Sequence, residues 1–207
     1  MSARDSILAA VRANRPQGKH PLPDLPAFPL DDGGDRTGFF LNNLRAMGGD
    51  GVREGEVADL LAVRFPEATV IASAVPEHPG NRDLTHVTHP RDLADVDVAI
   101  VRARFGIAET GSVLLVDDAL IVNAVAYLAQ HLIVLLDPAD ILLTLQDAYR
   151  RPEVQWHHYA SLHTGPSATA DIEGVLIHGA QGVRSLTVLF RPSDTPISYP
   201  SASRPAQ

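Results

Sequence analysis

Five consecutive apolar residues, Leu132-Ile133-Val134-Leu135-Leu136, followed by Asp137-Pro138, decide the fold of this chain. The run is rich in apolar and β-branched residues and carries no helix cap, so it predicts a strand. Asp137 can cap a helix and Pro138 suits a first helical turn, which predicts a helix over residues 138–150. The apolar face of that helix would contain Ile141, Leu142, Leu145 and Tyr149. A strand followed by a helix is typical of an α/β domain.

The same two patterns recur along the rest of the chain. Helices are predicted over residues 2–14, at the apolar positions of 40–47, and over 57–65. Further strands are predicted over residues 69–73, 96–101, 113–116, 120–122, 156–162, 174–178 and 185–190. Helices on both sides of continuous apolar strands predict a three-layer α/β/α domain with an N-terminal helical arm.

The length and composition fit one folded domain with two extensions. The chain has 207 residues, 45% of them hydrophobic, and a domain of this size buries roughly 70% of the surface of its unfolded chain. Five prolines between residues 16 and 30 favour an extended connection. We therefore expect an N-terminal helix and proline-rich linker over residues 1–34, the α/β domain over 35–191, and a mobile tail over 192–207.

Charge and cysteine content exclude several functional classes. The 25 acidic residues exceed the 17 lysines and arginines, and the formal net charge of −8 disfavours binding to nucleic acid. Without cysteine, the chain forms no disulfide and holds no cysteine-ligated iron–sulfur cluster of its own. There is no recognisable signal peptide, and the longest apolar run, residues 119–129, is too short to span a bilayer. We expect a cytoplasmic protein without membrane insertion.

A polar segment, Thr164-Gly165-Pro166-Ser167-Ala168-Thr169-Ala170-Asp171-Ile172-Glu173, interrupts the apolar stretches near the end of the chain. Gly165 and Pro166 suit an ordinary turn, but a turn does not require the hydroxyls and carboxylates that follow. Because functional side chains concentrate on loops that a scaffold holds in place, this decamer is a candidate binding loop.

A strand, a turn and a helix start over residues 160–173 would present free backbone N–H groups, with the Ser167 and Thr169 hydroxyls, to an anion. The alternative is structural, with Ser167 capping the turn and both carboxylates facing the helix dipole. Two ionised carboxylates would repel a bound anion unless a cation or a proton intervenes, so they could instead bind a metal or sugar-like hydroxyls. Of Asp171 and Glu173, which point in different directions on a helix, we expect Asp171 to face the pocket.

A second segment, Ile107-Ala108-Glu109-Thr110-Gly111-Ser112, precedes the apolar run Val113-Leu114-Leu115-Val116. Together with the decamer it resembles the LUD-domain family, most closely the lactate-utilisation protein C type, over residues 36–190. The resemblance implies a fold like that of the ribose-phosphate isomerase, glucosamine-phosphate deaminase and CoA-transferase group. It also implies iron–sulfur partner subunits within a bacterial lactate-oxidising system.

The chain departs from the family pattern at the turn before the last strand. Family members usually carry a histidine-glycine-proline turn there, whereas this chain has Gln181-Gly182-Val183-Arg184. If that histidine carries chemistry in relatives, this chain lacks the activity or uses another group. Gln181 would then preserve only hydrogen bonding.

Glu109 lies at a break between two predicted strands, where Thr110 and Gly111 allow close backbone approach. A carboxylate at the end of a sheet could act as a base or a nucleophile, and a glutamate forms the acyl intermediate in fold relatives that transfer CoA. A structural, hydrogen-bonding role for Glu109 is equally open.

Histidines and cofactor motifs give no further site. Imidazole is a common metal ligand, but the chain has no HExxH motif, and histidine spacing alone predicts no metal site. The histidines considered are His86, His89, His157, His158 and His163. No glycine-rich nucleotide-binding motif is present, so the sequence encodes no recognisable cofactor.

The sequence therefore predicts an accessory subunit in the oxidation of lactate to pyruvate, which binds a small anionic ligand and iron–sulfur partner proteins. The alternative is an independent enzyme that acts on a sugar phosphate or an acyl-CoA through Glu109. The candidate catalytic residues are Glu109 and Asp171. The candidate ligand-binding residues are Thr110, Gly111, Thr164, Gly165, Pro166, Ser167, Thr169 and Glu173.

Overall fold

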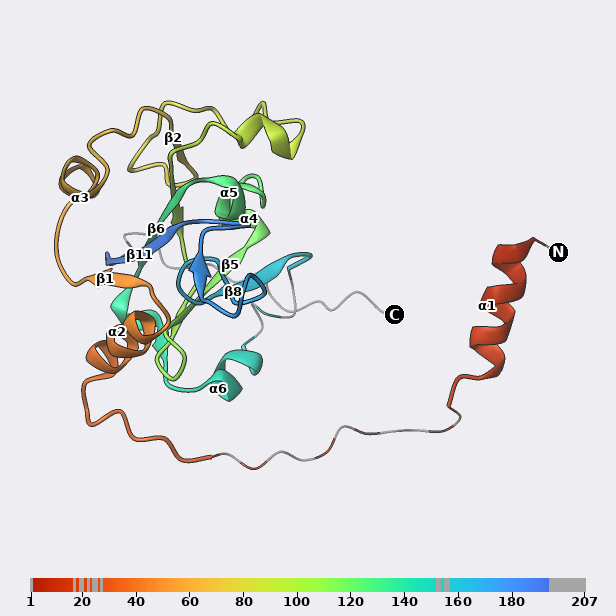
Figure 1. Ribbon diagram of the computed structural model, residues 1–207. Helices are drawn as coiled ribbons and strands as arrows, with labels where there is room; N and C mark the ends of the chain where they lie inside the picture. The colour runs from red at the N-terminus through yellow and green to blue at the C-terminus, as the bar shows by residue number, and fades with distance from the viewer. Residues whose placement is uncertain are drawn as a thin grey trace.

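A five-stranded parallel sheet forms the centre of the molecule (Figure 1). The structure is a computed structural model that describes residues 2–16, 18, 21, 23, 26, 28–151, 154 and 157–193. The strands of this sheet are β1 (Asp50–Val52), β2 (Ile71–Ser73), β3 (Val98–Arg102), β6 (His131–Leu136) and β11 (Ser185–Phe190). Their order is β1-β11-β6-β3-β2, and each neighbouring pair is parallel.

β6 lies in the middle of the sheet and is covered on both faces. Leu132 and Val134 belong to the larger apolar cluster on one face, whereas Ile133 and Leu135 belong to the cluster on the other. A strand that is buried on both faces needs an unbroken apolar run, which is why this stretch of sequence identifies it. The strands predicted over 132–136 and 185–190 are confirmed.

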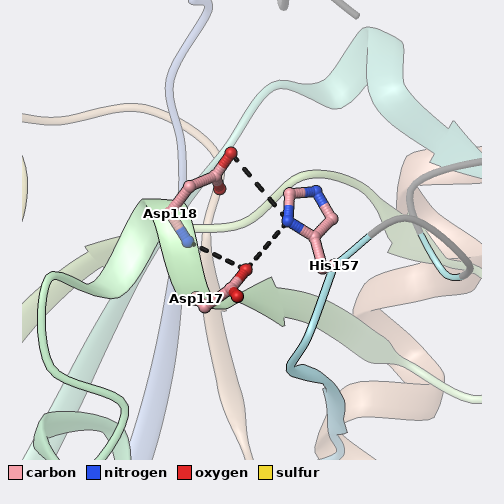
Figure 2. A group of neighbouring side chains, drawn as sticks. All are labelled: Asp117, Asp118 and His157. Carbon is pink, nitrogen blue, oxygen red and sulfur yellow. Dashed lines mark hydrogen bonds and ion pairs between the residues drawn. The ribbon is translucent and has the colours of Figure 1, made fainter. Parts of the chain in front are cut away.

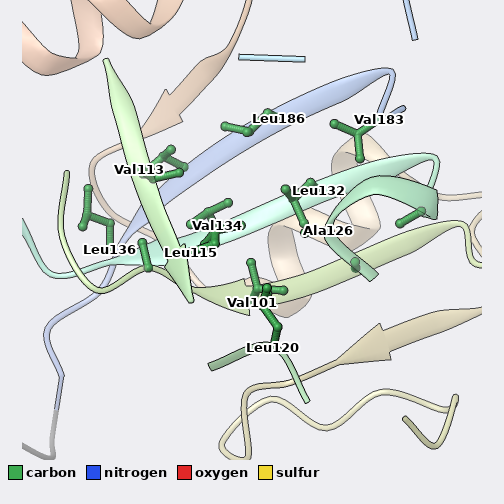
Figure 3. Packing of buried hydrophobic residues seen from close by; sticks show 14 of the residues in the cluster. Val101, Val113, Leu115, Leu120, Ala126, Leu132, Val134, Leu136, Val183 and Leu186 are labelled. Carbon is green, nitrogen blue, oxygen red and sulfur yellow. The ribbon is translucent and has the colours of Figure 1, made fainter. Parts of the chain in front are cut away.

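Helices cover both faces of the parallel sheet. On one face, Val57 and Leu60 of α3 (Val57–Arg64) pack against the sheet. On the other face, the larger cluster joins the sheet to α2 (Arg36–Ala46), α4 (Asp117–Leu120) and α5 (Val125–Leu128) (Figure 3). The helices predicted at 40–47 and 57–65 are confirmed as α2 and α3.

A second, four-stranded sheet shares the larger cluster with these helices. It contains β7 (Ile141–Leu142), β4 (Gly106–Ile107), β5 (Ser112–Val116) and β8 (Ala160–His163), in that order. Alternate residues of β5 face opposite sides, with Val113 in the larger cluster and Leu114 in a third cluster beside α6 (Leu145–Tyr149). The domain is therefore mixed α/β with a parallel sheet, and one of its covering layers is itself partly a sheet.

A short hairpin and two 3₁₀ turns complete the fold. β9 (Ala168–Thr169) and β10 (Ile177–His178) form an antiparallel hairpin after β8. A 3₁₀ turn, η1 (Pro90–Leu93), precedes β3, and a second, η2 (Pro138–Asp140), follows β6.

α1 (Ala3–Ala13) lies apart from the rest of the described chain (Figure 1). Ser2 and Asp5 form a capping box at its N-terminus, which explains why the helix begins there. None of its residues is buried, and the side chains of Ile7 and Val11 are each 63% exposed. The helix predicted over residues 2–14 is confirmed.

The helix predicted over residues 138–150 is wrong for most of its length. The chain forms η2, then β7, and only then α6. Ile141 and Leu142 pair with Gly106 and Ile107 of β4, so their backbone groups belong to the second sheet. Thr144 then starts α6 with its own capping box, and this local start replaces the one predicted at Asp137.

The strand predicted over residues 120–122 is also wrong. Leu120 ends α4, and Ile121 adopts a positive φ of 60°, which a strand does not contain. The strand predicted over 174–178 is present only as β10. The first residue of the strand predicted over 156–162 and the tail from residue 194 onward lie outside the described residues.

Candidate functional site

The AETG loop, residues 108–111, turns the chain from β4 into β5. The backbone N–H of Glu109 donates to the carbonyl oxygen of Leu143 at 3.0 Å. Its exposed carboxylate accepts a hydrogen bond from the backbone N–H of Leu145, the first residue of α6, at 2.8 Å. Glu109 therefore satisfies one of the donors that the start of a helix leaves without an intrahelical partner.

Three hydroxyls join the AETG loop to the TGPS loop, residues 164–167. The Oγ of Ser112 lies 2.7 Å from Thr110 Oγ1 and 2.6 Å from Thr164 Oγ1. Antiparallel pairing of β5 with β8 places Val113 opposite His163, so the two loops leave the second sheet at the same end. Ser112 is only 3% exposed, and this chain of hydroxyls is therefore an internal connection between the two motifs.

Both loops rest on the C-terminal end of α2 through direct backbone contact. Gly111 and Gly165 have positive φ values of 66° and 70°. A Cβ on Gly111 would lie 2.2 Å from the backbone nitrogen of Leu44, and one on Gly165 would lie 2.3 Å from the carbonyl oxygen of Met47. Any side chain at either position would displace the backbone of α2, so glycine is required by shape at both positions.

The decamer forms a hairpin, and the helix predicted to start within residues 160–173 is wrong. After the TGPS loop the chain enters β9, and Asp171 and Glu173 lie in the exposed turn between β9 and β10. The backbone N–H of Ser167 donates to the carbonyl oxygen of Val183 at 3.0 Å. Some of the backbone N–H groups that were predicted to bind an anion therefore donate hydrogen bonds to neighbouring strands and turns.

A pocket of about 310 Å³ lies beside the TGPS loop. The end of β8, α5 and the turn at residues 181–183 form its other walls. Outside the TGPS loop, its polar side chains come from Tyr127, Ser161, His163 and Gln181. Among the described residues that line this TGPS pocket there is one imidazole and no carboxylate, so its chemistry is that of uncharged hydrogen-bonding groups.

His163 is the most perturbed titratable group of the TGPS pocket. Burial of its side chain lowers the pKa to about 4, so the imidazole is neutral at pH 7. Its Nε2 is sealed from solvent and has no hydrogen-bond partner among the described residues. The ring of Tyr127 lies beside it, with a centroid separation of 5.0 Å. A buried polar atom without a partner is uncommon in folded proteins.

Tyr127 adjoins this imidazole and connects it to a second tyrosine, Tyr159. The hydroxyl of Tyr127 is hydrogen-bonded to that of Tyr159 and also donates to Ser161 Oγ at 3.0 Å. Burial, and then the contact with Tyr127, raise the pKa of Tyr159 to about 12, so its hydroxyl is neutral at pH 7. Of the two tyrosines, Tyr127 lines the TGPS pocket.

The structure brings together some of the predicted site residues and separates others. The predicted residues that line the TGPS pocket are Thr164, Gly165, Pro166 and Ser167. Thr110 connects to them through Ser112, whereas Glu109 is turned toward α6. Thr169 accepts a hydrogen bond from the backbone of Asp171 within the hairpin. Functional roles for Glu109, Thr169, Asp171 and Glu173 stay predictions.

Sequence reasoning missed the contributions of Tyr127 and His163 to this pocket. Nothing in the local sequence places Tyr127, which arrives from α5 through packing of that helix on the parallel sheet. His163 carried a weak signal, because it directly precedes the TGPS loop at the end of a predicted strand. Gln181, which is predicted to replace a family histidine, also lines this pocket.

Among the described residues, none of the helices has the length and apolar character that crossing a bilayer requires.

Comparison with known proteins places this fold and these loops in one family. No curated protein matches the chain. A DUF162 family protein from Deinococcus radiodurans has a similar crystal structure, with a TM-score of 0.58 and 16% sequence identity over 78% of this chain and 99% of that one. The model of the LUD domain matches residues 82–190, which include both loops, and the chain belongs to the LUD domain family.

Proposed function

We propose that this protein is an accessory subunit in the oxidation of lactate to pyruvate, and that the TGPS pocket binds a small anionic ligand. Membership of the LUD domain family supports the pathway. Because the chain contains no cysteine, iron–sulfur clusters in such a system would belong to partner subunits on which this protein docks.

The observation that carries the ligand part of the proposal is the group of uncharged polar side chains in the wall of the TGPS pocket. The hydroxyls of Thr164 and Ser167 and the amide of Gln181 can each donate a hydrogen bond. A carboxylate accepts several such bonds. The volume of about 310 Å³ suits a molecule of the size of lactate or pyruvate with some bound water.

The geometry gives less support to an independent enzyme that works through Glu109. One carboxylate oxygen of Glu109 is bonded to the backbone of Leu145, and the residue does not line the TGPS pocket. Asp171 lies in the exposed turn of the hairpin, away from that pocket's lining. The likeness to the ribose-phosphate isomerase and CoA-transferase group stays a prediction about fold.

Calorimetric titration of the purified protein with lactate and with pyruvate tests the ligand part. We expect Ser167→Ala and Gln181→Ala each to weaken binding about threefold to tenfold, as expected for loss of one hydrogen bond. Gln146→Ala, a matched change in α6 at a residue that does not line the pocket, should leave binding unchanged. Equal affinity in all four proteins would remove the TGPS pocket as the binding site, and absence of heat with either acid would reject these ligands.

Growth on lactate and affinity purification test the pathway part. Deletion of the gene should abolish growth on lactate, and the tagged protein should recover an iron–sulfur protein from cells grown on lactate. Normal growth after deletion, together with recovery of no iron–sulfur protein, would reject the proposed role whatever the calorimetry shows.

A further inference from the structure

A second group of chemically active side chains lies at the other end of the β5–β8 pair. Asp117 and Asp118 follow β5 directly, and His157 precedes β8. Pairing of Val116 with Ala160 brings these two chain segments together. One ligand-type atom from each of the three side chains lies within 4.8 Å of the other two. Figure 2 shows Nδ1 of the imidazole facing both carboxylates.

We propose that Asp117, Asp118 and His157 form a binding site for a divalent transition-metal ion of the Zn²⁺ class. Two carboxylates and one imidazole are a donor set that Zn²⁺ accepts, and the imidazole favours such ions over Mg²⁺ and Ca²⁺, which prefer oxygen ligands alone. The spacing of the histidines alone predicts no metal site at this position. Here the carboxylates come from a different strand, so no sequence motif joins them to His157.

The distances between the side chains fit one shared ion. Nδ1 of His157 lies 2.8 Å from Asp117 Oδ1 and 3.9 Å from Asp118 Oδ2. Ligands held at roughly 2.0–2.1 Å around a tetrahedral Zn²⁺ are about 3.3 Å apart, midway between these values. The two separations from His157 therefore bracket the ideal value, and all three ligand atoms lie within 4.8 Å of one another.

Neighbouring groups hold the two carboxylates in place. The backbone N–H of Asp118 donates to Asp117 Oδ1 at 3.1 Å, and Arg104 Nη2 bonds to Asp118 Oδ2 at 2.6 Å. Such second contacts fix the orientation of ligand side chains. Asp117, Asp118 and Arg104 together carry a formal net charge of −1, which attracts a cation.

The group also has room for additional ligands. A cavity of about 400 Å³ is lined by the three side chains and by His158, so water or this second imidazole can complete the coordination. The side chains of His157 and Asp117 are 18% and 29% exposed, which leaves an entry path while limiting hydration. None of the residues that line this cavity lines the TGPS pocket, so the site does not depend on the proposed function.

A simple ion pair is the competing interpretation, and the chain contains one for comparison. His86 Nδ1 lies 2.6 Å from Asp83 Oδ2. Among the described residues, this pair belongs to no group of three possible metal ligands, and its side chains are 86% and 58% exposed. His86→Ala is therefore the matched control for His157→Ala, because each change removes one imidazole from one aspartate.

The test is titration of the chelator-treated full-length protein with Zn²⁺ and, as a spectroscopic probe, Co²⁺. We expect one equivalent of tight binding, a visible Co²⁺ absorption band, and a rise in the melting temperature that depends on Zn²⁺ concentration. His157→Ala, Asp117→Asn and Asp118→Asn should each weaken this binding at least tenfold, whereas His86→Ala should bind as the parent does. Mg²⁺ should not displace Co²⁺.

Circular dichroism of each variant separates loss of a ligand from loss of the fold. The test needs only one of these three variants to keep the fold. Zn²⁺ affinity that is unchanged in the folded variants, or reduced as strongly by His86→Ala, would show an ion bound elsewhere and overturn the proposal. Absence of tight binding by the parent protein would overturn it as well.

Discussion

The hydroxyl of Ser112 lies 2.6 Å from the hydroxyl of Thr164, and this contact joins two loops whose residues are 52 positions apart in the chain. The same Ser112 hydroxyl also contacts Thr110 in the AETG loop. Because Ser112 is almost completely buried, water cannot replace either hydrogen bond without entering the protein interior. The two family motifs therefore form one structural unit.

Replacement of Ser112 by alanine should destabilise the protein by about 1–3 kcal/mol, since it leaves the partly buried hydroxyls of Thr110 and Thr164 without this partner. Denaturant unfolding measures the effect. Thr88→Val is the control, because Thr88 is exposed and its hydroxyl makes a single 3.4 Å contact with Asp92. Equal small losses in both variants would contradict an internal role for the Ser112 hydroxyl.

Gly111→Ala and Gly165→Ala should each destabilise the protein by more than about 3 kcal/mol or prevent folding. Each adds a methyl group inside the backbone of α2 as well as strain at positive φ. Gly174→Ala isolates the second effect, because Gly174 also has a positive φ but a Cβ there would meet nothing within 4 Å. That control should cost only about 1–2 kcal/mol. Thermal unfolding of the three variants would reject close approach as the cause if their losses were equal.

The stability of the protein should fall as the pH is lowered from about 6.5 to about 4. Burial lowers the pKa of His163 to about 4, whereas an unfolded histidine titrates near 6.5. Between these values the unfolded chain binds a proton that the folded chain does not, so the free energy of unfolding decreases with acidification. The full contribution is present above about pH 6.5, and roughly 3 kcal/mol is lost by about pH 4.

Unfolding measured between pH 4 and 8 in the parent and in His163→Gln checks this expectation. The variant should lose most of the slope and keep a smaller one, because desolvation and the nearby Arg184 also lower the pKa of His131. An identical slope in both proteins would mean that His163 is not buried in its neutral form.

Glu109→Ala should destabilise the protein by about 1 kcal/mol, because it removes the acceptor for the backbone N–H of Leu145 at the start of α6. Glu109→Gln keeps an oxygen acceptor and should lie close to the parent. Glu173→Ala serves as the control at an exposed position of the hairpin turn. A loss as large in Glu109→Gln as in Glu109→Ala would point to the negative charge rather than the hydrogen bond as the important feature.

Deletion of residues 2–14 should change the melting temperature of the domain by less than about 2 °C, since α1 contributes no buried residue. Differential scanning calorimetry compares the two chains. A drop of several degrees would show that Ile7 and Val11, although exposed here, are covered in solution.

The parts of the fold that the sequence predicts are those whose local pattern and tertiary environment agree. Residues 132–136 form a strand buried on both faces, and continuous apolar sequence is what such burial requires. Residues 141–142 show the opposite case, because their apolar spacing suits a helix while pairing with β4 makes them a strand. The partner strand, only two residues long, gives no pattern of its own from which this pairing could be inferred.

The candidate site was predictable only as a loop. The polar residues that follow Gly165 and Pro166 identified the TGPS loop, but the hairpin beyond it depends on Ile177 and His178 pairing back onto Ala168 and Thr169. The other walls of the TGPS pocket come from α5 and the turn at 181–183, which are distant in sequence. The assembled sheets bring these walls close to the TGPS loop, and the residue types of the loop alone do not predict that proximity.

The position of β11 has a consequence for the order of synthesis. It is the last strand of the described chain, yet it lies between β1 and β6 and pairs with both. While a ribosome makes residues 137–184, β6 has no neighbour on that side, and β1 has no sheet to join. An apolar strand with a free edge can pair with another unfinished chain. The interval before residues 185–190 emerge is therefore the period in which the nascent protein is most exposed to misassembly and to chaperones.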